Sequence, residues 1–272
     1  MVGSAPNCDL PNPWAMDDNQ NQRDVSRICV LAGQMLLQHG AESTLVADIT
    51  RRLAYALGMA QVELSLSANA MVLTTIENDH CITTARQCPD RGINMRVVTD
   101  IQHICIMAER GVLDRQGVKT KLDALTPERY NRWLVLVVIG LSCAAFSRLA
   151  GGDLAVFLLT FLASCCGMFV RQEIAHRHFN PLLNFGATAF VTTAVSAQAI
   201  LFDIGNEPFL AMASSVLMLV PGFPLINAVS DMVKGHINMG LARWVMASLL
   251  TLSTCLGIIL AMNIFQVWPW LI

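Results

Sequence analysis

Charged residues are scarce in this sequence, and the shortage lies almost entirely in its second half. Only 14% of the 272 residues are Asp, Glu, Lys or Arg, against about a quarter in a typical soluble domain. Residues 1–132 hold 28 of the 38 charged residues, and residues 133–272 hold the other ten. The first half is long enough for a soluble domain with its own core. The second half is too apolar for one and is typical of a membrane region.

Sequence motifs for catalysis, metal binding and nucleic-acid binding are also missing. There is no CxxC, no phosphate-binding glycine loop, no GxSxG and no HExxH. The nine cysteines show no metal-ligand spacing and are expected as buried or lipid-facing thiols in a reducing cytosol. The net charge of −2 gives no basic surface for nucleic acid. We therefore expect no enzyme, no metal, no cofactor and no nucleic-acid partner, and the N-terminus shows no cleavable signal.

Residues 21–128 are predicted to form an α+β domain that follows a disordered tail over residues 1–20. Apolar residues at helical spacing alternate with β-type stretches along this half of the chain. The expected elements are helices over 23–38, from Ser43 to about 57, over 100–110 and over 114–125, and strands over 62–67, 70–76, 81–85 and 93–98. The turn before residue 81 predicts that the second and third strands form a hairpin.

Uncharged runs within residues 129–272 predict a five-helix transmembrane bundle. The predicted spans cover residues 133–150, 154–170, 181–202, 208–230 and 244–267. Six basic residues flank these spans on one side, whereas Arg148 alone lies on the other. The excess of Lys and Arg indicates the cytoplasmic side. The sequence thus predicts a multi-pass protein of the cell inner membrane, with a cytosolic N-terminal domain and the C-terminus outside.

The fourth predicted span contains a helix break at Pro221-Gly222-Phe223-Pro224. Pro221 lacks an N–H group and clashes with the preceding turn, and it lies roughly 20 Å along a helix from Pro208, within the hydrocarbon core. Broken backbone at that depth requires surrounding protein or a watery cavity. Pro224 suits the first turn of a second half-helix, whose N-terminus favours an anion. The alternative is a structural proline kink with no role in transport.

Polar residues follow the break and also line the third predicted span. Asn227, Asp231 and Lys234 share one helical face with Pro224, because their spacing is three, seven and ten residues. In the third span, four-residue spacing produces a polar stripe that comprises Asn184, Thr188, Thr192 and Ser196. Such a stripe either lines a substrate pathway or holds two helices together.

Four sequence blocks resemble those of the threonine/serine exporter (ThrE-type) family, and the resemblance covers about residues 22–272. The blocks are Gln38–Ser43, Arg91–Met95, Pro221–Ala228 and Lys234–Asn238. The match is closest to the branch of the family in which the transporter is split into two chains. The resemblance implies a cytosolic N-terminal domain followed by a membrane bundle. Full-length members carry a second set of spans, so the split branch implies a small YjjB-like membrane subunit as the partner.

The resemblance to the split branch implies succinate, or another small carboxylate, as the exported substrate. The full-length branch implies threonine and serine, and a membrane-anchored enzyme or sensor is the alternative from another class. A dicarboxylate needs at least two positive features, for which Arg171, Lys234 and Arg243 are the candidate side chains. Asp231 either carries a coupling proton or pairs with Lys234 or Arg243. The predicted substrate-binding residues are Pro221, Gly222, Pro224, Asn227, Asp231, Lys234, Arg171, Arg243, Asn184, Thr188 and Thr192. Membrane lipid surrounds the predicted spans, and a higher oligomer is left open.

Overall fold

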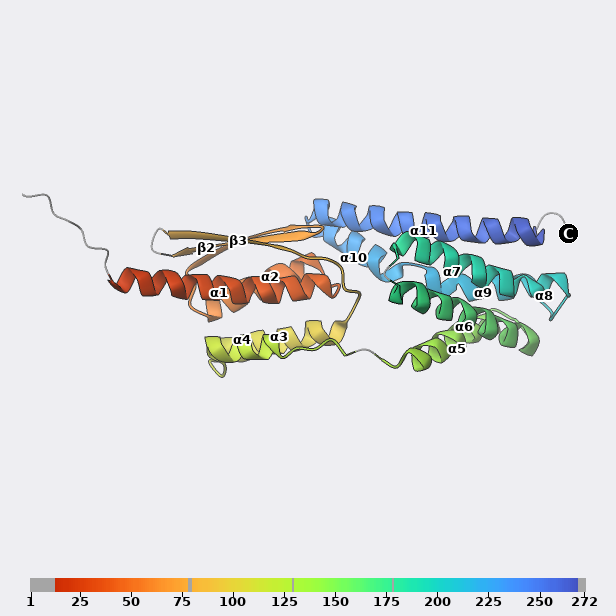
Figure 1. The fold of residues 1–272 in the computed structure, drawn as a ribbon, viewed down its shortest axis with the longest axis horizontal. Coiled ribbons are helices and arrows are strands. Elements are labelled where there is room, and N and C mark those ends of the chain that lie inside the picture. Colours follow the sequence, from red (N-terminus) through yellow and green to blue (C-terminus); the bar gives the residue numbers. More distant parts are fainter. Residues whose placement is uncertain (1–12, 78–79, 129, 178, 269–272) are drawn as a thin grey trace, which may run out of the picture. The chain divides into compact units, whose positions relative to one another are not determined.

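The computed structural model describes residues 13–77, 80–128, 130–177 and 179–268, and the chain divides into two compact units (Figure 1). The N-terminal unit comprises the chain up to Pro127 together with a later segment, Asn227–Ala242. The membrane unit comprises Glu128–Ile226 and the chain from Arg243 onward. The segment Asn227–Ala242, which follows five helices of the membrane unit in sequence, is therefore part of the N-terminal unit.

The N-terminal unit has three layers, with two helices between a small sheet and two further helices. Its elements are α1 (Pro13–Gln38), α2 (Ser43–Ala56), β1 (Gln61–Ser67), β2 (Ala70–Glu77), β3 (His80–Gln87), α3 (Met95–Glu109) and α4 (Arg115–Asp123). The strands form an antiparallel sheet in the order β1–β2–β3. Helices α1 and α2 pack on the sheet, and α3 and α4 pack on the other side of these helices (Figure 1). The predicted α+β arrangement and its hairpin are present.

Helix α1 is buried on opposite sides because it lies between β2 and α3. Val25, Cys29 and Leu36 are fully buried, and Met71 of β2 belongs to the same core. A Cβ atom on Gly33 would lie 2.5 Å from the Met71 Cε atom. Glycine at this position therefore lets α1 approach the sheet closely, and burial of this apolar surface stabilises the unit.

Two predictions at the ends of elements are wrong. The strand predicted over 93–98 is the start of α3, whose N-cap Asn94 accepts a hydrogen bond from the Val97 amide through its side chain (3.4 Å). This cap satisfies a free amide of the first turn. The helix predicted from Arg23 begins at Pro13 and so overlaps the predicted disordered tail over 13–20. Residues 1–12 of that tail lie outside the described residues.

The membrane unit contains helices that are long and apolar enough to cross a bilayer. Its elements are α5 (Arg132–Leu149), α6 (Leu154–His176), α7 (Pro181–Ser196), α8 (Gln198–Leu201), α9 (Pro208–Val216), a 3-10 turn (Leu217–Leu219), the first residues of α10 (Gly222–Val233) and most of α11 (Ile237–Phe265). Among the described residues, α5, α6 and α11 qualify as spans, and the bent pair of α9 and α10 brings the number to as many as four. Helix α6 packs against α5, α7 and α9.

The five-span bundle is supported only in part. The third predicted span, over 181–202, is not one continuous helix because α7 ends at Ser196. The Ser196 hydroxyl donates to the carbonyl oxygen of Thr192 (3.0 Å), and such bonds to the preceding turn bend helices. The last helix begins at Ile237, earlier than predicted, so Arg243 lies on α11 and not in a loop. A single charged residue near a helix end does not stop an otherwise apolar helix.

The small-residue face of α11 packs against α7 of the same chain. A Cβ atom on Gly257 would overlap the carbonyl oxygen of Gly186 and lie 3.0 Å from the Ala189 Cβ atom. Nearby, the Ser253 hydroxyl donates to the carbonyl oxygen of Leu182 (2.6 Å). Small residues that let two backbones approach are typical of helix contacts in membranes.

Replacing Gly257 with leucine is expected to lower the melting temperature of the purified protein in detergent. The added side chain has no space against Gly186, and overpacking costs about 1–3 kcal/mol. The matched control is Leu256→Ala on the same helix, because Leu256 is exposed. A Gly257→Leu protein that melts at the wild-type temperature would contradict this close contact.

Candidate functional site

The predicted break in the fourth span is present between Leu219 and Gly222. The 3-10 turn ends at Leu219, Val220 is extended with φ −67° and ψ 119°, and α10 begins at Gly222. The axes of the two helical parts differ by 54°. Pro221 explains the break because it cannot donate to a carbonyl of the preceding turn. Pro224 lies in the first turn of α10, where a helix does not use the missing amide.

The break releases a backbone carbonyl that Arg171 of α6 satisfies. In a continuous helix the carbonyl of Met218 would accept from the amide of Gly222. That amide instead donates to the carbonyl of Val220 (2.8 Å). The Arg171 guanidinium donates to the Met218 oxygen (3.2 Å) and lies 4.6 Å from the centroid of the Phe185 ring. A guanidinium over an aromatic face gains cation–π attraction, so Arg171 is held at the interruption of the span.

The polar stripe of α7 continues from Arg171 into the contact between α6 and α7. The Asn184 amide donates to the backbone oxygen of Arg171 (3.2 Å), and the Thr188 hydroxyl donates to the Asn184 side-chain oxygen (3.3 Å). The Thr192 hydroxyl donates to the carbonyl of Thr188 (2.8 Å), one turn back in its own helix. Both threonines are fully buried. Asn184 therefore orients the segment that carries Arg171, whereas the threonines fill the helix contact.

The polar face of α10 meets the start of α2 within the N-terminal unit. The Asn227 amide donates to the carbonyl of Gly40 (3.0 Å). The two carboxylate oxygens of Asp231 accept from the Ser43 amide and from the Ser43 hydroxyl, each at 2.9 Å. Gly40 ends α1 with φ +85°, a conformation that glycine adopts without strain. The chain can therefore turn and present the first amide of α2 to Asp231.

Asp231 acts as a cap supplied by a distant helix. The N-cap residue of α2 is Glu42, which makes no capping bond with its side chain. Asp231 supplies the missing acceptor, and its negative charge lies at the positive end of the α2 dipole. Its side chain is fully buried, so the Ser43 donors replace the water that a carboxylate otherwise requires.

Glu42 forms the second part of the same contact. Its carboxylate pairs with the Lys234 ammonium group and accepts a hydrogen bond from the Ser230 hydroxyl (3.0 Å). The predicted shared face of Asn227, Asp231 and Lys234 is thus directed to residues 40–43. We name these seven residues the α2–α10 contact: Gly40, Glu42, Ser43, Asn227, Ser230, Asp231 and Lys234.

Sequence reasoning placed the helix break but missed four of the seven residues of the α2–α10 contact. Gly40, Glu42, Ser43 and Ser230 were not among the predicted site residues, although the first three lie in a block that resembles the exporter family. The structure places Arg243, which is half-buried, in the second turn of α11. Across the described residues no group of three His, Cys, Asp or Glu side chains is arranged to hold a metal ion.

Comparison with known proteins gives one family and several relatives. A family model described as "Putative threonine/serine exporter" (ThrE) matches residues 27–265. The "Probable succinate transporter subunit YjjP" of Escherichia coli K12 is 52% identical over 252 residues, which are 92% of this chain and 98% of that protein. The protein of the same name in Klebsiella aerogenes is 51% identical, over 93% of this chain and 98% of that protein.

A more distant relative is about twice as long as the matched region. The "Probable threonine/serine exporter" of Mycobacterium tuberculosis is 21% identical over 90% of this chain, and the match covers 47% of that protein. No solved structure matches this chain. The family model spans most of the sequence, including both the residues of the α2–α10 contact and the helix break. The chain therefore belongs to the threonine/serine exporter (ThrE) family.

Proposed function

We propose that this chain is one subunit of a secondary transporter that exports succinate, a small dicarboxylate, across the cell inner membrane. The observation that carries the proposal is the broken span, with Arg171 held at the carbonyl that the break releases. A helix start and a guanidinium are two positive features in one part of the membrane unit, as a dianion requires. The names of the relatives that are 51% and 52% identical support succinate as the substrate.

In this proposal the substrate lies at the start of α10, near Pro221, Gly222 and Pro224, with Arg171 as its cation. A Cβ atom built on Gly222 would meet no atom within 4 Å, so the backbone there has open space beside it. Close approach to the first turn gives a carboxylate access to the Phe223 amide, because the Gly222 and Leu225 amides donate to the carbonyls of Val220 and Pro221 and Pro224 has no amide hydrogen. Asn227, Asp231 and Lys234 position the other end of α10 through the α2–α10 contact.

We also propose a small YjjB-like membrane subunit as the partner and the cytoplasm as the location of the N-terminal unit. The word "subunit" in the relatives' names supports a second chain. The excess of basic residues on one side of the predicted spans supports the orientation. Alkaline phosphatase fused after residue 128 is expected to be inactive, and fused after the last residue it is expected to be active. The reverse pattern would overturn this orientation.

The direct test is counterflow of labelled succinate in proteoliposomes that contain this chain alone, the partner alone, or both. We expect uptake only with both chains, with unlabelled succinate as the strongest competitor. Competition by threonine and serine instead would favour the amino-acid exporter, which the name of the M. tuberculosis relative also supports. Absence of counterflow for all three compounds with both chains present would contradict the proposed function.

A further inference from the structure

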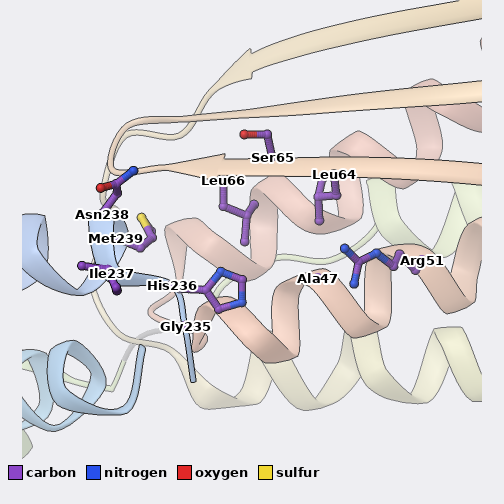
Figure 2. Close-up of a pocket in the computed structure, with 10 residues that line it drawn as sticks. All are labelled: Ala47, Arg51, Leu64, Ser65, Leu66, Gly235, His236, Ile237, Asn238 and Met239. Carbon is purple, nitrogen blue, oxygen red and sulfur yellow. The ribbon is translucent and has the colours of Figure 1, made fainter. Parts of the chain in front are cut away.

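A pocket of about 230 Å³ lies in the N-terminal unit, apart from the helix break (Figure 2). It is formed by three segments of this unit: α2, β1 and the turn that leads into α11. Its lining residues are Ala47, Arg51, Leu64, Ser65, Leu66, Gly235, His236, Ile237, Asn238 and Met239. A pocket of this size is smaller than typical drug-binding sites and suits a small molecule.

The turn that forms one wall of the pocket is fixed in place by backbone geometry and by the core. Gly235 has φ +89°, and the His236 amide donates to the carbonyl of Asp231 (2.8 Å), so the chain reverses directly after α10. Met239 is 3% exposed and packs in the core of the N-terminal unit. The wall therefore belongs to the folded unit, and the residues between these anchors face the pocket in a defined conformation.

Two side chains with N–H donors face this pocket from different elements. Figure 2 shows the Arg51 guanidinium extending from α2 toward the His236 ring, which comes from the turn before α11. Within the described part of the chain, neither side chain has a hydrogen-bond or ion-pair partner. Arg51 always carries a positive charge, and its planar group binds carboxylates with two hydrogen bonds. The backbone amides at the start of α11 add partial positive charge on the His236 side.

We propose that this pocket is a second anion site, which binds a small dicarboxylate with one carboxylate on Arg51 and the other on His236 and the first turn of α11. Leu64 and Leu66 also line the pocket, and their apolar side chains suit the methylene carbons of such a ligand. The identification of the ligand as a dicarboxylate rests on the proposed function, whereas the anion site rests on the pocket itself.

The test is calorimetric titration of succinate into the full-length chain in detergent, in the Arg171→Gln background that removes the cation of the proposed transport site. We expect binding to remain in Arg171→Gln and to weaken by about tenfold or more when Arg51→Gln or His236→Gln is added. Butyrate, which has one carboxylate, is expected to bind more weakly than succinate. Inorganic phosphate is the third probe.

The neighbouring Arg52→Gln is the matched control. Arg52 lies on the same helix but pairs with Glu109 of α3 through two bonds of 2.7 Å, and this hydrogen bonding lowers the pKa of Glu109. Arg52→Gln in the same background should bind succinate as Arg171→Gln does. Equal binding with and without Arg51, or no binding in Arg171→Gln, would overturn the proposal, as would a preference for phosphate. Counterflow measures the proposed function separately, so the two failures are distinguishable.

Discussion

Asp231→Asn is expected to lower succinate export by roughly tenfold, the effect of about 1.4 kcal/mol, while the protein remains in the membrane. The asparagine retains one acceptor for the Ser43 amide but loses the negative charge at the start of α2. Its NH₂ group also faces the Ser43 hydroxyl, which must rotate to accept a bond. The α2–α10 contact weakens as a result. Helix α10, whose first turn is the proposed substrate site, is then held less firmly in position.

Asp231→Ala is expected to have a larger effect, because the buried Ser43 amide then has no acceptor. Such a loss costs about 1–3 kcal/mol, and both export and melting temperature should fall. Ser43→Ala is the matched variant, since it removes only the hydroxyl bond and keeps the amide bond.

The same variants separate positioning from proton coupling. If Asp231 positions α10, then Asp231→Asn lowers both counterflow and export driven by a pH gradient. Gradient-driven export that is lost while counterflow and melting temperature stay at wild-type values would show instead that Asp231 carries a proton.

Arg171→Gln is expected to abolish succinate export to within the background of empty liposomes. The substitution removes the positive charge at the break and weakens the donor to the Met218 carbonyl. A charge-assisted contact is about twice as strong as a neutral one, so a glutamine that keeps the hydrogen bond does not replace the arginine. Labelled succinate counterflow with the partner present is the measurement.

Two variants control for charge and for folding. Arg171→Lys keeps the charge but not the planar group that stacks on Phe185, so partial export is expected. Arg177→Gln lies at the end of the same helix, where Arg177 is mostly exposed and pairs with Glu173 (3.2 Å), and wild-type export is expected. An Arg171→Gln protein that exports succinate normally would remove Arg171 from the substrate site.

The helix break was predictable from sequence because its cause is local. Pro221 has no amide hydrogen wherever it is placed, so a helix through it must lose a bond. The strands β1 and β2 were predictable for a similar reason, since alternation along β1 reflects one buried face and β2 is rich in Val, Leu and Thr. Val97 and Val98 misled the prediction because short apolar runs suit strand and buried helix equally. The hydrogen bond from the Val97 amide to the Asn94 side chain caps the first turn and stabilises the helix there.

The partners of the site residues were not predictable because they lie far away in the sequence. Asp231 and Ser43 are 188 residues apart, and their spacing carries no signal that they meet. Asn184 and Thr188 belong to a regular polar stripe in the sequence. Only the packing of α6 on α7 shows that Asn184 supports the backbone of Arg171, whereas Thr188 fills the contact between the two helices. The end of α7 at Ser196 likewise lies inside an uncharged run, where no apolar pattern marks it.

The return of Asn227–Ala242 to the N-terminal unit has a consequence for biosynthesis. The ribosome makes residues up to Pro127 long before this segment, so the nascent domain emerges with Ser43 uncapped and the place of Met239 empty. Its folding can finish only after α5 to α9 have been synthesised and delivered to the insertion machinery. A chain whose late helices insert wrongly would therefore leave this domain without the acceptor for Ser43 and without Met239 in its core.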